Sequence, residues 1–342
     1  MVDALQAAGV KAFGPTKAAA KLEWSKAFAK DFMKRHGIPT ASSETFVSLD
    51  EALAYIKARP VPIVIKADGL ALGKGVVIAQ SAEEAEATLR EFMSGEKFGE
   101  SGKTVVIEEF MEGKEVSIHA FCDGTTAKLF PVSRDHKRIF DGNQGPNTGG
   151  MGTIAPVPGL QDGFLEEVAE EIVMPTVRGM AKEGTPFSGL LYPGLMLTKD
   201  GPKVVEFNAR FGDPECESYM RLLESDLVSA MLACVEGRLE KEDIRWSHSA
   251  AVTVMLASGG YPGSYQKGFP ITGITEAESD PSIVVFHAGT ALKEGGVVTA
   301  GGRVLGVSAT GKDIEEARRR VYAAAGRIDF EGKQFRSDIG AV

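Results

Sequence analysis

Apolar and polar positions along this chain of 342 residues predict a mixture of helices and strands. Apolar side chains that recur at about every third or fourth residue indicate amphipathic helices, whereas β-branched runs bounded by Gly, Pro or Asn indicate strands. Helices are predicted at 16–36, 50–59, 82–93, 166–182 (divided near Pro175), 214–236 and 313–328. Strands are predicted at 10–13, 61–66, 75–79, 104–110, 115–122, 127–132, 189–198 and 202–208.

The order of these elements favours an α+β fold, with no internal repeat. From about residue 250 the chain changes to short strands with Gly-rich turns, which indicates a smaller α+β module. Residues 133–152 show no apolar periodicity and are predicted to form a long loop. Loops of this length inside compact domains are usually functional or disordered.

Charge and cysteine content narrow the class of protein. The net charge of −9 argues against a nucleic-acid binder, which usually carries a basic face. The three cysteines have no paired spacing, so a disulfide framework or zinc site is not expected and a reducing cytoplasm fits best. No apolar run reaches membrane-spanning length. We therefore expect a cytoplasmic enzyme or binding protein without a membrane or nucleic-acid partner.

A pair of oxygen-bearing side chains on one predicted strand suggests a metal site. Glu206 and Asn208 alternate with Phe207, so both project from the same face. Carboxylate and amide oxygens suit Mg²⁺, which keeps waters and phosphate oxygens as its other ligands. The alternative is a solvent-facing polar strand edge. Arg210, Asp213 and Glu215 add closely spaced charges on the turn that follows, and they favour the site.

The segment KADGLALGKGVV (66–77) resembles a phosphate-binding loop without matching a P-loop. It lacks the Ser or Thr after the lysine and joins strand to strand, which predicts a hairpin. Lys66 and Lys74 can both reach a polyphosphate. Glycines let backbone N–H groups approach anionic oxygens. The alternative is an exposed hairpin with solvated lysines. The glycines concerned are Gly69, Gly73 and Gly75.

Two further segments carry candidate chemistry. Strand-end backbone at Glu109–Met111 can present hydrogen-bonding groups to an adenine edge, and Glu115 can accept from ribose hydroxyls, although acidic residues at strand ends are common. In the loop 133–152, Asp135 can hold an ammonium group, while basic side chains and the glycine-rich GPNTGGMG (145–152) suit an anionic substrate. A disordered basic loop is the alternative. The basic side chains are Arg134, His136, Lys137 and Arg138.

The sequence offers no arrangement of Ser/His/Asp or Cys/His residues that indicates a covalent nucleophile. The chemistry that these segments favour is metal-assisted phosphoryl transfer, in which the protein positions groups and neutralises charge.

Taken together, the flap KADGxxxGKG, the hinge EEF and the metal strand ExN resemble the ATP-grasp ligases, in which two β-rich lobes clamp ATP. Within that class RFGDPECES (210–218), GPNTGGMG (145–152) and RDHKR (134–138) resemble the glycinamide ribonucleotide synthetases, or phosphoribosylamine–glycine ligases. The resemblance runs along almost the whole chain. It implies that ATP phosphorylates glycine and that 5-phosphoribosylamine attacks the glycyl phosphate, giving glycinamide ribonucleotide, ADP and phosphate in purine synthesis.

The resemblance also implies roles for individual residues and a monomer that uses ATP with Mg²⁺ or Mn²⁺. Arg210 would steady the acyl phosphate, and Asp135 and Lys137 would act with it at the substrate end. The other implied substrate contacts are Arg134, Asn147, Gly149, Gly150 and Asp213. The implied nucleotide contacts are Lys66, Gly69, Gly73, Lys74, Gly75, Glu108, Glu109, Phe110, Met111 and Glu115, with Glu206 and Asn208 on the metal.

The sequence departs from the family pattern at its start. The dinucleotide-fold-like domain that begins family members is missing, so we expect a truncated synthetase that binds ATP but ligates weakly or not at all. The strand before ExN lacks the acidic second-metal ligand of many ATP-grasp enzymes. The alternative hypotheses are another ATP-grasp carboxylate–amine ligase and an ATP-binding module without turnover. The expected parts are a remnant with a connecting helix (1–41), a flap subdomain (42–112), a core (113–249) and a C-terminal module (250–342).

Overall fold

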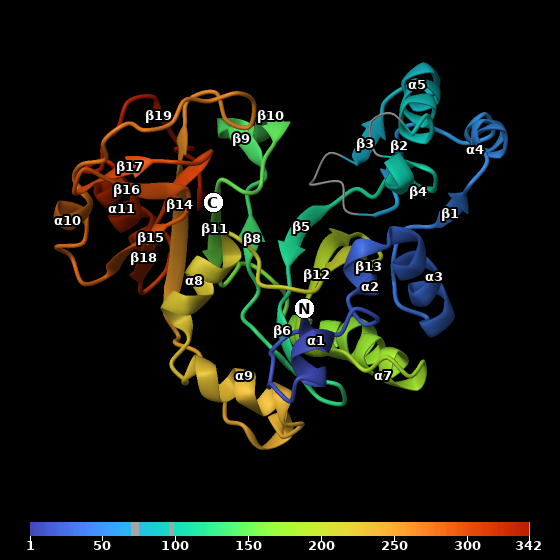
Figure 1. Cartoon of the computed structure of the whole chain (residues 1–342), viewed down its shortest axis with the longest axis horizontal. Coiled ribbons are helices and arrows are strands. Elements are labelled where there is room, and N and C mark those ends of the chain that lie inside the picture. The colour runs from blue at the N-terminus through green and yellow to red at the C-terminus, as the bar shows by residue number, and fades with distance from the viewer. Residues whose placement is uncertain (70–74, 96–98, 342) are drawn as a thin grey trace. The chain divides into compact units, whose positions relative to one another are not determined.

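The computed structural model describes residues 1–69, 75–95 and 99–341 (Figure 1). The chain forms two compact units, each assembled from separate stretches of sequence. The first unit contains residues 1–129, 161–210 and 228–242, and the second contains 130–160, 211–227 and 243–342. The division into four parts made from the sequence stays a prediction.

The first unit contains a four-stranded antiparallel sheet in the order β1-β4-β2-β3. The predicted hairpin is confirmed, because β2 and β3 pair antiparallel with Lys66 opposite Val76. Two helices, α4 and α5, accompany the sheet, and a core that includes Ile65, Leu89 and Phe92 is fully buried. The bounds are β1 Ser43–Phe46, β2 Ile63–Ala67, β3 Val76–Ala79, β4 Val105–Glu109, α4 Leu49–Ile56 and α5 Ala82–Met93.

A second sheet of the first unit is built around the long strand β12. The strand β13 pairs with one edge of β12, and β5 and β6 pair with successive parts of the other edge. The predicted strand 115–122 is therefore two strands, since each half pairs with a different part of β12. The bounds are β5 Lys114–Ser117, β6 Ala120–Asp123, β7 Ala127–Leu129, β12 Ser188–Thr198 and β13 Gly201–Asn208.

Two predictions for the N-terminal segment are wrong. Residues 10–13 form no strand in the described structure, since no neighbouring strand pairs with them, and the Phe13 ring packs edge-on against Phe121 instead. The helix predicted at 16–36 is two helices separated at Ser25. That residue has an extended backbone, and its hydroxyl accepts from the Phe28 N–H as an N-cap. The helices are α1 Val2–Ala7, α2 Lys21–Trp24 and α3 Lys26–His36.

The second unit is centred on an antiparallel sheet in the order β15-β18-β14-β11-β8, to which β19 adds at β14. Helix α11 packs against β14 and β18 (Figure 1, red end of the chain). Four buried hydroxyl groups form a hydrogen-bonded chain across β11, α8, β14 and β18: Thr153, Ser218, Thr253 and Ser308. The bounds are β8 Arg134–Asp135, β11 Gly152–Ala155, β14 Ala250–Ser258, β15 Ile283–His287, β18 Arg303–Gly311, β19 Lys333–Gln334 and α11 Ile314–Ala325.

The prediction of a long loop at 133–152 is also wrong. This segment contains β8 and a small hairpin of β9 and β10, because its backbone pairs with neighbours that its sequence does not reveal. The edge strand β8 pairs with β11, which itself pairs with the distant β14. Alternation of apolar residues is weak here because most side chains remain partly exposed. The hairpin strands are β9 Arg138–Phe140 and β10 Gln144–Asn147.

The remaining elements are short. The helix predicted at 166–182 is divided, as expected, by a π-helical turn at Ala169–Val173 that precedes Pro175. Within the part of the chain that the structure describes, no helix has both the length and the apolarity that a membrane crossing requires. The bounds are α6 Phe164–Val168, α7 Met174–Lys182, α8 Glu215–Leu222, α9 Leu227–Val235, α10 Ile274–Ala277, β16 Thr290–Lys293 and β17 Gly296–Thr299.

Candidate active site

The strand β13 carries the two side chains predicted to bind metal. A β-bulge at Val205 lies opposite the step from Gly194 to Leu195, so alternation changes phase there. As a result Val204 and Phe207 are both buried, although they are three residues apart. Glu206 and Asn208 are half-buried on the other face. Strict alternation would place Glu206 and Asn208 on the same face as the buried Val204. The bulge instead places them on the face opposite the apolar core.

Lys66 is joined to this strand. Its side chain is nearly fully buried, and its ammonium donates to the Val205 carbonyl oxygen at 3.1 Å. The same ammonium lies 2.8 Å from a carboxylate oxygen of Glu108 at the end of β4. The hairpin lysine and the metal strand are thus in direct contact within the first unit, because the bulge residue presents its carbonyl to Lys66.

Lys30, on helix α3, completes a buried ionic network. Its ammonium lies 2.8 Å from the other carboxylate oxygen of Glu108 and donates to the Thr40 hydroxyl at 2.8 Å. Thr40 in turn donates to the Val204 carbonyl at 2.6 Å. Burial lowers the pKa of Lys30 to about 8, and the charge of Glu108 opposes that change. One carboxylate therefore serves two buried lysines.

A third lysine, Lys26, comes from the first turn of α3. Its ammonium donates to the Gly69 carbonyl at 3.0 Å, at the start of the glycine-rich hairpin. Burial lowers the pKa of Lys26, and the negative charge of Glu206 acts in the opposite direction. Asp68 accepts hydrogen bonds from the Ser25 hydroxyl and the Ala27 N–H. The helix start and the hairpin are thereby fixed to one another.

The predicted hinge follows β4. Glu109 is exposed, and its carboxylate accepts from the Ser42 N–H at 2.9 Å. Phe110 is 38% exposed, a large fraction for an aromatic ring, and Met111 is half-buried. Glu115 lies on β5 opposite Met196. Among the hairpin glycines, Gly69 and Gly75 are described, whereas Gly73 and Lys74 lie outside the described residues.

Arg210 lies directly after the metal strand. Its guanidinium donates to the amide oxygen of Asn208 at 3.3 Å and pairs with Glu23 of α2 at 3.2 Å. The other carboxylate oxygen of Glu23 accepts from the Ala209 N–H at 3.1 Å. Glu23 thus holds both the backbone and the arginine at the end of β13. The arginine side chain is mostly exposed.

In the second unit, Asp135 is the most perturbed of the predicted substrate residues. Burial, followed by the charge of Glu215, raises its pKa well above the ordinary value, while Lys137 opposes that effect. One of its carboxylate oxygens is buried without a hydrogen-bond partner among the described residues. Glu215 begins helix α8 and is 2% exposed. Two carboxyl groups therefore share a buried environment, which favours a proton or a cation between them.

The glycine-rich segment 145–152 packs closely on this carboxyl group. The Gly149 N–H donates to the Tyr261 hydroxyl at 3.0 Å. A side chain at Gly150, where φ is +116°, would lie 2.6 Å from an Asp135 oxygen and 2.4 Å from Pro214. Only glycine fits this position. Asn147, on β10, is exposed, and Arg134 lies on β8 opposite Ile154.

The turn before α8 is tied to the same segment by Arg303. Its guanidinium pairs with the Asp213 carboxylate at 2.9 Å and donates to the Asp213 carbonyl at 2.8 Å. Burial, and then the charge of Asp213, raises the pKa of Glu217 to about 7. The second unit therefore gathers four carboxyl groups near one arginine: Asp135, Asp213, Glu215 and Glu217.

The donor set on β13 fits a hard divalent cation. Glu206 supplies a carboxylate and Asn208 an amide oxygen, and Mg²⁺ commonly takes a small number of protein oxygens and completes its shell with phosphate and water. Within the described ranges no group of three or more His, Cys, Asp or Glu side chains could hold a metal ion by itself. A two-ligand site of this kind leaves the other coordination positions to phosphate oxygens and water.

Several residues that the structure brings into these sites were not predicted from the sequence. Lys26 and Lys30 are four residues apart on α3, so they share one helix face, and that spacing was the available signal. Arg303 follows two glycines at a strand start, a pattern with no specific meaning. The contacts of Glu23 and Arg303 join segments distant in sequence, which one sequence does not reveal.

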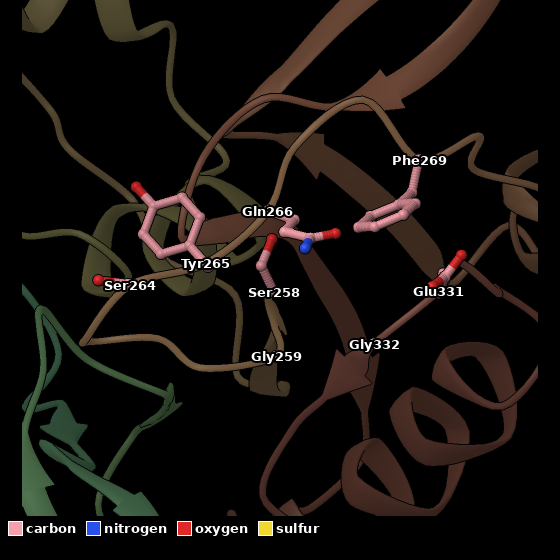
Figure 2. Close-up of a pocket in the computed structure, with 8 residues that line it drawn as sticks. All are labelled: Ser258, Gly259, Ser264, Tyr265, Gln266, Phe269, Glu331 and Gly332. Atoms are coloured by element: carbon pink, nitrogen blue, oxygen red, sulfur yellow. The ribbon is translucent and has the colours of Figure 1, made fainter.

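A pocket of about 470 Å³ lies elsewhere in the second unit (Figure 2). In Figure 2, Ser258 and Gln266 lie between the rings of Tyr265 and Phe269. None of the predicted site residues lines it. The lining residues are Ser258, Gly259, Ser264, Tyr265, Gln266, Phe269, Glu331 and Gly332.

The antiparallel hairpin with its buried lysine, beside a strand that carries Glu206 and Asn208, defines the ATP-grasp class. Solved structures share this fold. The biotin carboxylase domain of Hydrogenobacter thermophilus 2-oxoglutarate carboxylase, solved with MgADP, ADP and bicarbonate, matches 97% of this chain with a TM-score of 0.74 at 17% identity. At that identity the match shows the fold alone.

The chain belongs to the phosphoribosylglycinamide synthetase family. Family models for its ATP-grasp (A) domain and its C domain match residues 24–216 and 251–342. The phosphoribosylamine–glycine ligase of Vibrio vulnificus strain CMCP6 is 49% identical over 341 residues, which are 99% of this chain and 79% of that protein.

Two further comparisons agree. The trifunctional purine biosynthetic protein adenosine-3 of Gallus gallus is 50% identical over 342 residues, which are 34% of that protein. The crystal structure of the Thermotoga maritima phosphoribosylamine–glycine ligase matches 96% of this chain and 81% of its own, with a TM-score of 0.88 and 42% identity. The predicted family, the ATP-grasp fold and the ligase class are confirmed.

Proposed function

We propose that this protein catalyses the ATP-dependent ligation of glycine to 5-phosphoribosylamine; the weak or absent ligation expected from the sequence stays a prediction, which the rate in the assay below tests. A carboxylate is a poor electrophile, so the γ-phosphoryl group of ATP is first transferred to a carboxylate oxygen of glycine, giving glycyl phosphate and ADP. The amine of phosphoribosylamine then attacks the acyl carbon, the C–O bond to phosphate breaks and a proton leaves the nitrogen. The products are glycinamide ribonucleotide and phosphate.

In this proposal the first unit binds ATP. Lys66, together with Lys74, contacts the phosphates, and the glycines around them allow close approach of the backbone. The segment Glu108–Met111 meets the adenine edge, and Glu115 accepts from the ribose hydroxyls. The buried pair of Lys66 with Glu108 holds the ammonium in one place, so that little ordering remains when the triphosphate arrives.

Glu206 and Asn208 would hold Mg²⁺ or Mn²⁺. When bound, the ion neutralises charge on the phosphate oxygens during transfer. Lys66 donates to the carbonyl of Val205, the residue next to Glu206. This hydrogen bond holds the Lys66 ammonium, which would bind phosphate, beside the metal ligands. Arg210, held by Glu23, would donate to the acyl phosphate.

The second unit would bind the non-nucleotide substrates. The protein would act as a monomer. Asp135 and Lys137 would contact the charged groups of these substrates, because a buried carboxyl group without a full set of hydrogen bonds favours an ammonium partner. Gly149 and Gly150 would lie along the substrates, beside the Asp135 carboxyl group. The other proposed contacts are Arg134, Asn147 and Asp213.

One observation carries the assignment of phosphoryl transfer: the 3.1 Å hydrogen bond between Lys66 and Val205 within the metal strand. The sequence separation of these residues is large, and only the fold brings them together. The identity of the substrates rests on the family to which the chain belongs.

The test measures ADP release and product mass with ATP, Mg²⁺, glycine and freshly generated phosphoribosylamine. We expect ADP release to require all components, and Glu206→Gln to lower it by about 100-fold or more, because a preorganised charge at the transferring phosphoryl group is lost. Glu44→Gln, on the exposed strand edge of the same unit, is the matched control and should retain full activity.

ADP release that continues without glycine would overturn the substrate assignment, and a screen of other acids and amines would then identify another ligase. Binding of MgATP by calorimetry without ADP release under any condition would instead indicate a nucleotide-binding module. Unchanged activity in Glu206→Gln would overturn the metal role of β13.

A further inference from the structure

Arg303, the first residue of β18, joins two segments that are distant in sequence. Its guanidinium donates to the Gly149 carbonyl at 2.9 Å and, more weakly, to the Gly150 carbonyl at 3.4 Å. It also donates to the Asp213 carbonyl at 2.8 Å and pairs with the Asp213 carboxylate at 2.9 Å. All of these residues belong to the second unit. One planar group therefore fixes the segment 145–152 and the turn around Asp213 together.

Gly149 also packs closely against the guanidinium group of Arg303. A side chain at Gly149 would come within 3.0 Å of the central guanidinium carbon. The Gly149 N–H is held from another direction by the Tyr261 hydroxyl at 3.0 Å. Gly149 is thus bound through both its N–H and its carbonyl, although it is an exposed glycine with no side chain to anchor it. Such double anchoring specifies one backbone conformation.

Arg303 is also the cation that balances the surrounding acids. Its positive charge lowers the pKa of both Asp135 and Glu217, against the larger effect of burial. The groups facing it are Asp213, paired directly, with Asp135, Glu217 and Lys137 acting in the same cluster. Loss of the arginine would remove one of the positive charges that compensate these acidic groups, so the two loops would move apart or the carboxyl groups would take up protons.

We propose that Arg303 is a positioning residue for the non-nucleotide substrates, an inference that rests on the proposed function. It holds the backbone of Gly149 and Gly150 against the turn at Asp213 in the arrangement that binds them. Lysine cannot replace it fully, because one ammonium cannot take the places of both guanidinium nitrogens, one of which contacts the three carbonyls while the other contacts the Asp213 carboxylate. A purely structural role is the competing explanation, and the test separates the two.

The test compares Arg303→Ala, Arg303→Lys and Arg320→Ala. Arg320 is the matched control, since it makes the same kinds of bond in the same unit, to the Thr310 carbonyl and to Glu316, and contacts neither loop. Measurements are the KM for each substrate, the thermal midpoint and amide hydrogen exchange at 149–151, 212–213 and 215–216.

For Arg303→Ala we expect the KM for glycine or phosphoribosylamine to rise about tenfold or more, because small displacements of a positioning segment are costly. The KM for ATP should stay within about threefold, since the proposed ATP residues lie in the other unit. Exchange at the Gly149 and Gly150 amides should accelerate, and millimolar methylguanidinium should restore both readings. Arg303→Lys should rescue only in part, and Arg320→Ala should change none of these values.

Unchanged exchange at 149–151 in Arg303→Ala would overturn the proposed clamp. Faster exchange with unchanged substrate KM values would overturn the positioning role and leave a structural brace. If Arg303→Ala fails to fold, Arg303→Lys gives the same two readings. If the wild-type protein shows no glycine-dependent ADP release, the proposed function fails, and the exchange data still report separately on the clamp.

Discussion

At the scale of single residues, the most informative feature is a buried carboxylate shared by two lysines. Glu108 is 3% exposed and lies 2.8 Å from each of the ammonium groups of Lys30 and Lys66. This buried set carries one net positive charge, which is costly to bury without an anion. A triphosphate provides that anion. Lys66 could be predicted from the glycine-rich hairpin. Lys30 could not, because the sequence around it has the pattern of an ordinary amphipathic helix.

A prediction about pH follows from Glu217. Burial raises its pKa to about 7, so between its ordinary value and pH 7 the folded protein binds more protons than the unfolded chain. Stability from this group is therefore complete at low pH and is lost as the pH rises through 7, by at most about 3 kcal/mol. Glu217→Gln should raise the thermal midpoint at pH 8 and change it little at pH 5.

The control for this measurement is Glu224→Gln, at an exposed glutamate of the same unit. It should leave the thermal midpoint unchanged at both pH values. An equal effect of Glu217→Gln at pH 5 and pH 8 would show that the carboxyl group does not titrate in this window. The measurement needs only melting curves and no activity assay.

At the scale of elements, the sequence predicted local structure well and long-range pairing poorly. The hairpin at Lys66, the helix at Ala82–Met93 and the antiparallel pair β12–β13 were predicted, because each depends on residues close in sequence. The bulge at Val205 and the strands β8 to β10 were not, because the partners that select them come from distant segments. Glu206 and Asn208 were predicted for the same reason, since they lie two residues apart on one strand, whereas the contacts of Arg303 depend on distant segments.

In the second unit, the segment that contains Gly150 packs closely against Asp135 and Pro214. Gly150→Ala would combine a positive φ with atoms at 2.4 and 2.6 Å, whereas Gly159→Ala, in the same unit, meets only the positive φ of +73°. We expect the first variant to be about 2 kcal/mol less stable than the second, because overpacking adds to backbone strain. Denaturant unfolding of both variants is the measurement, and equal stability would contradict the packing described.

At the scale of the whole molecule, a bound nucleotide should act on the stability of the chain. MgATP at about 100 times its dissociation constant should stabilise the folded protein by about 2.7 kcal/mol, if only the folded state binds it. This predicts a rise in the thermal midpoint with MgATP. Lys66→Met should abolish most of the rise, whereas Lys57→Met, at an exposed position of the same unit, should retain it. A full rise in Lys66→Met would remove that lysine from the proposed phosphate site.

Each compact unit is assembled from separate stretches, and the chain passes between the units at 129/130, 160/161, 210/211, 227/228 and 242/243. During synthesis on the ribosome, the strand that carries Glu206 and Asn208 emerges only after Phe130–Leu160 of the other unit is already outside. Neither unit is therefore complete in the emerging chain before part of the other has emerged. Nascent chains halted before residue 242 would expose unfinished sheets to chaperones, and a gene divided at any point from 130/131 to 241/242 would encode neither unit whole on one fragment.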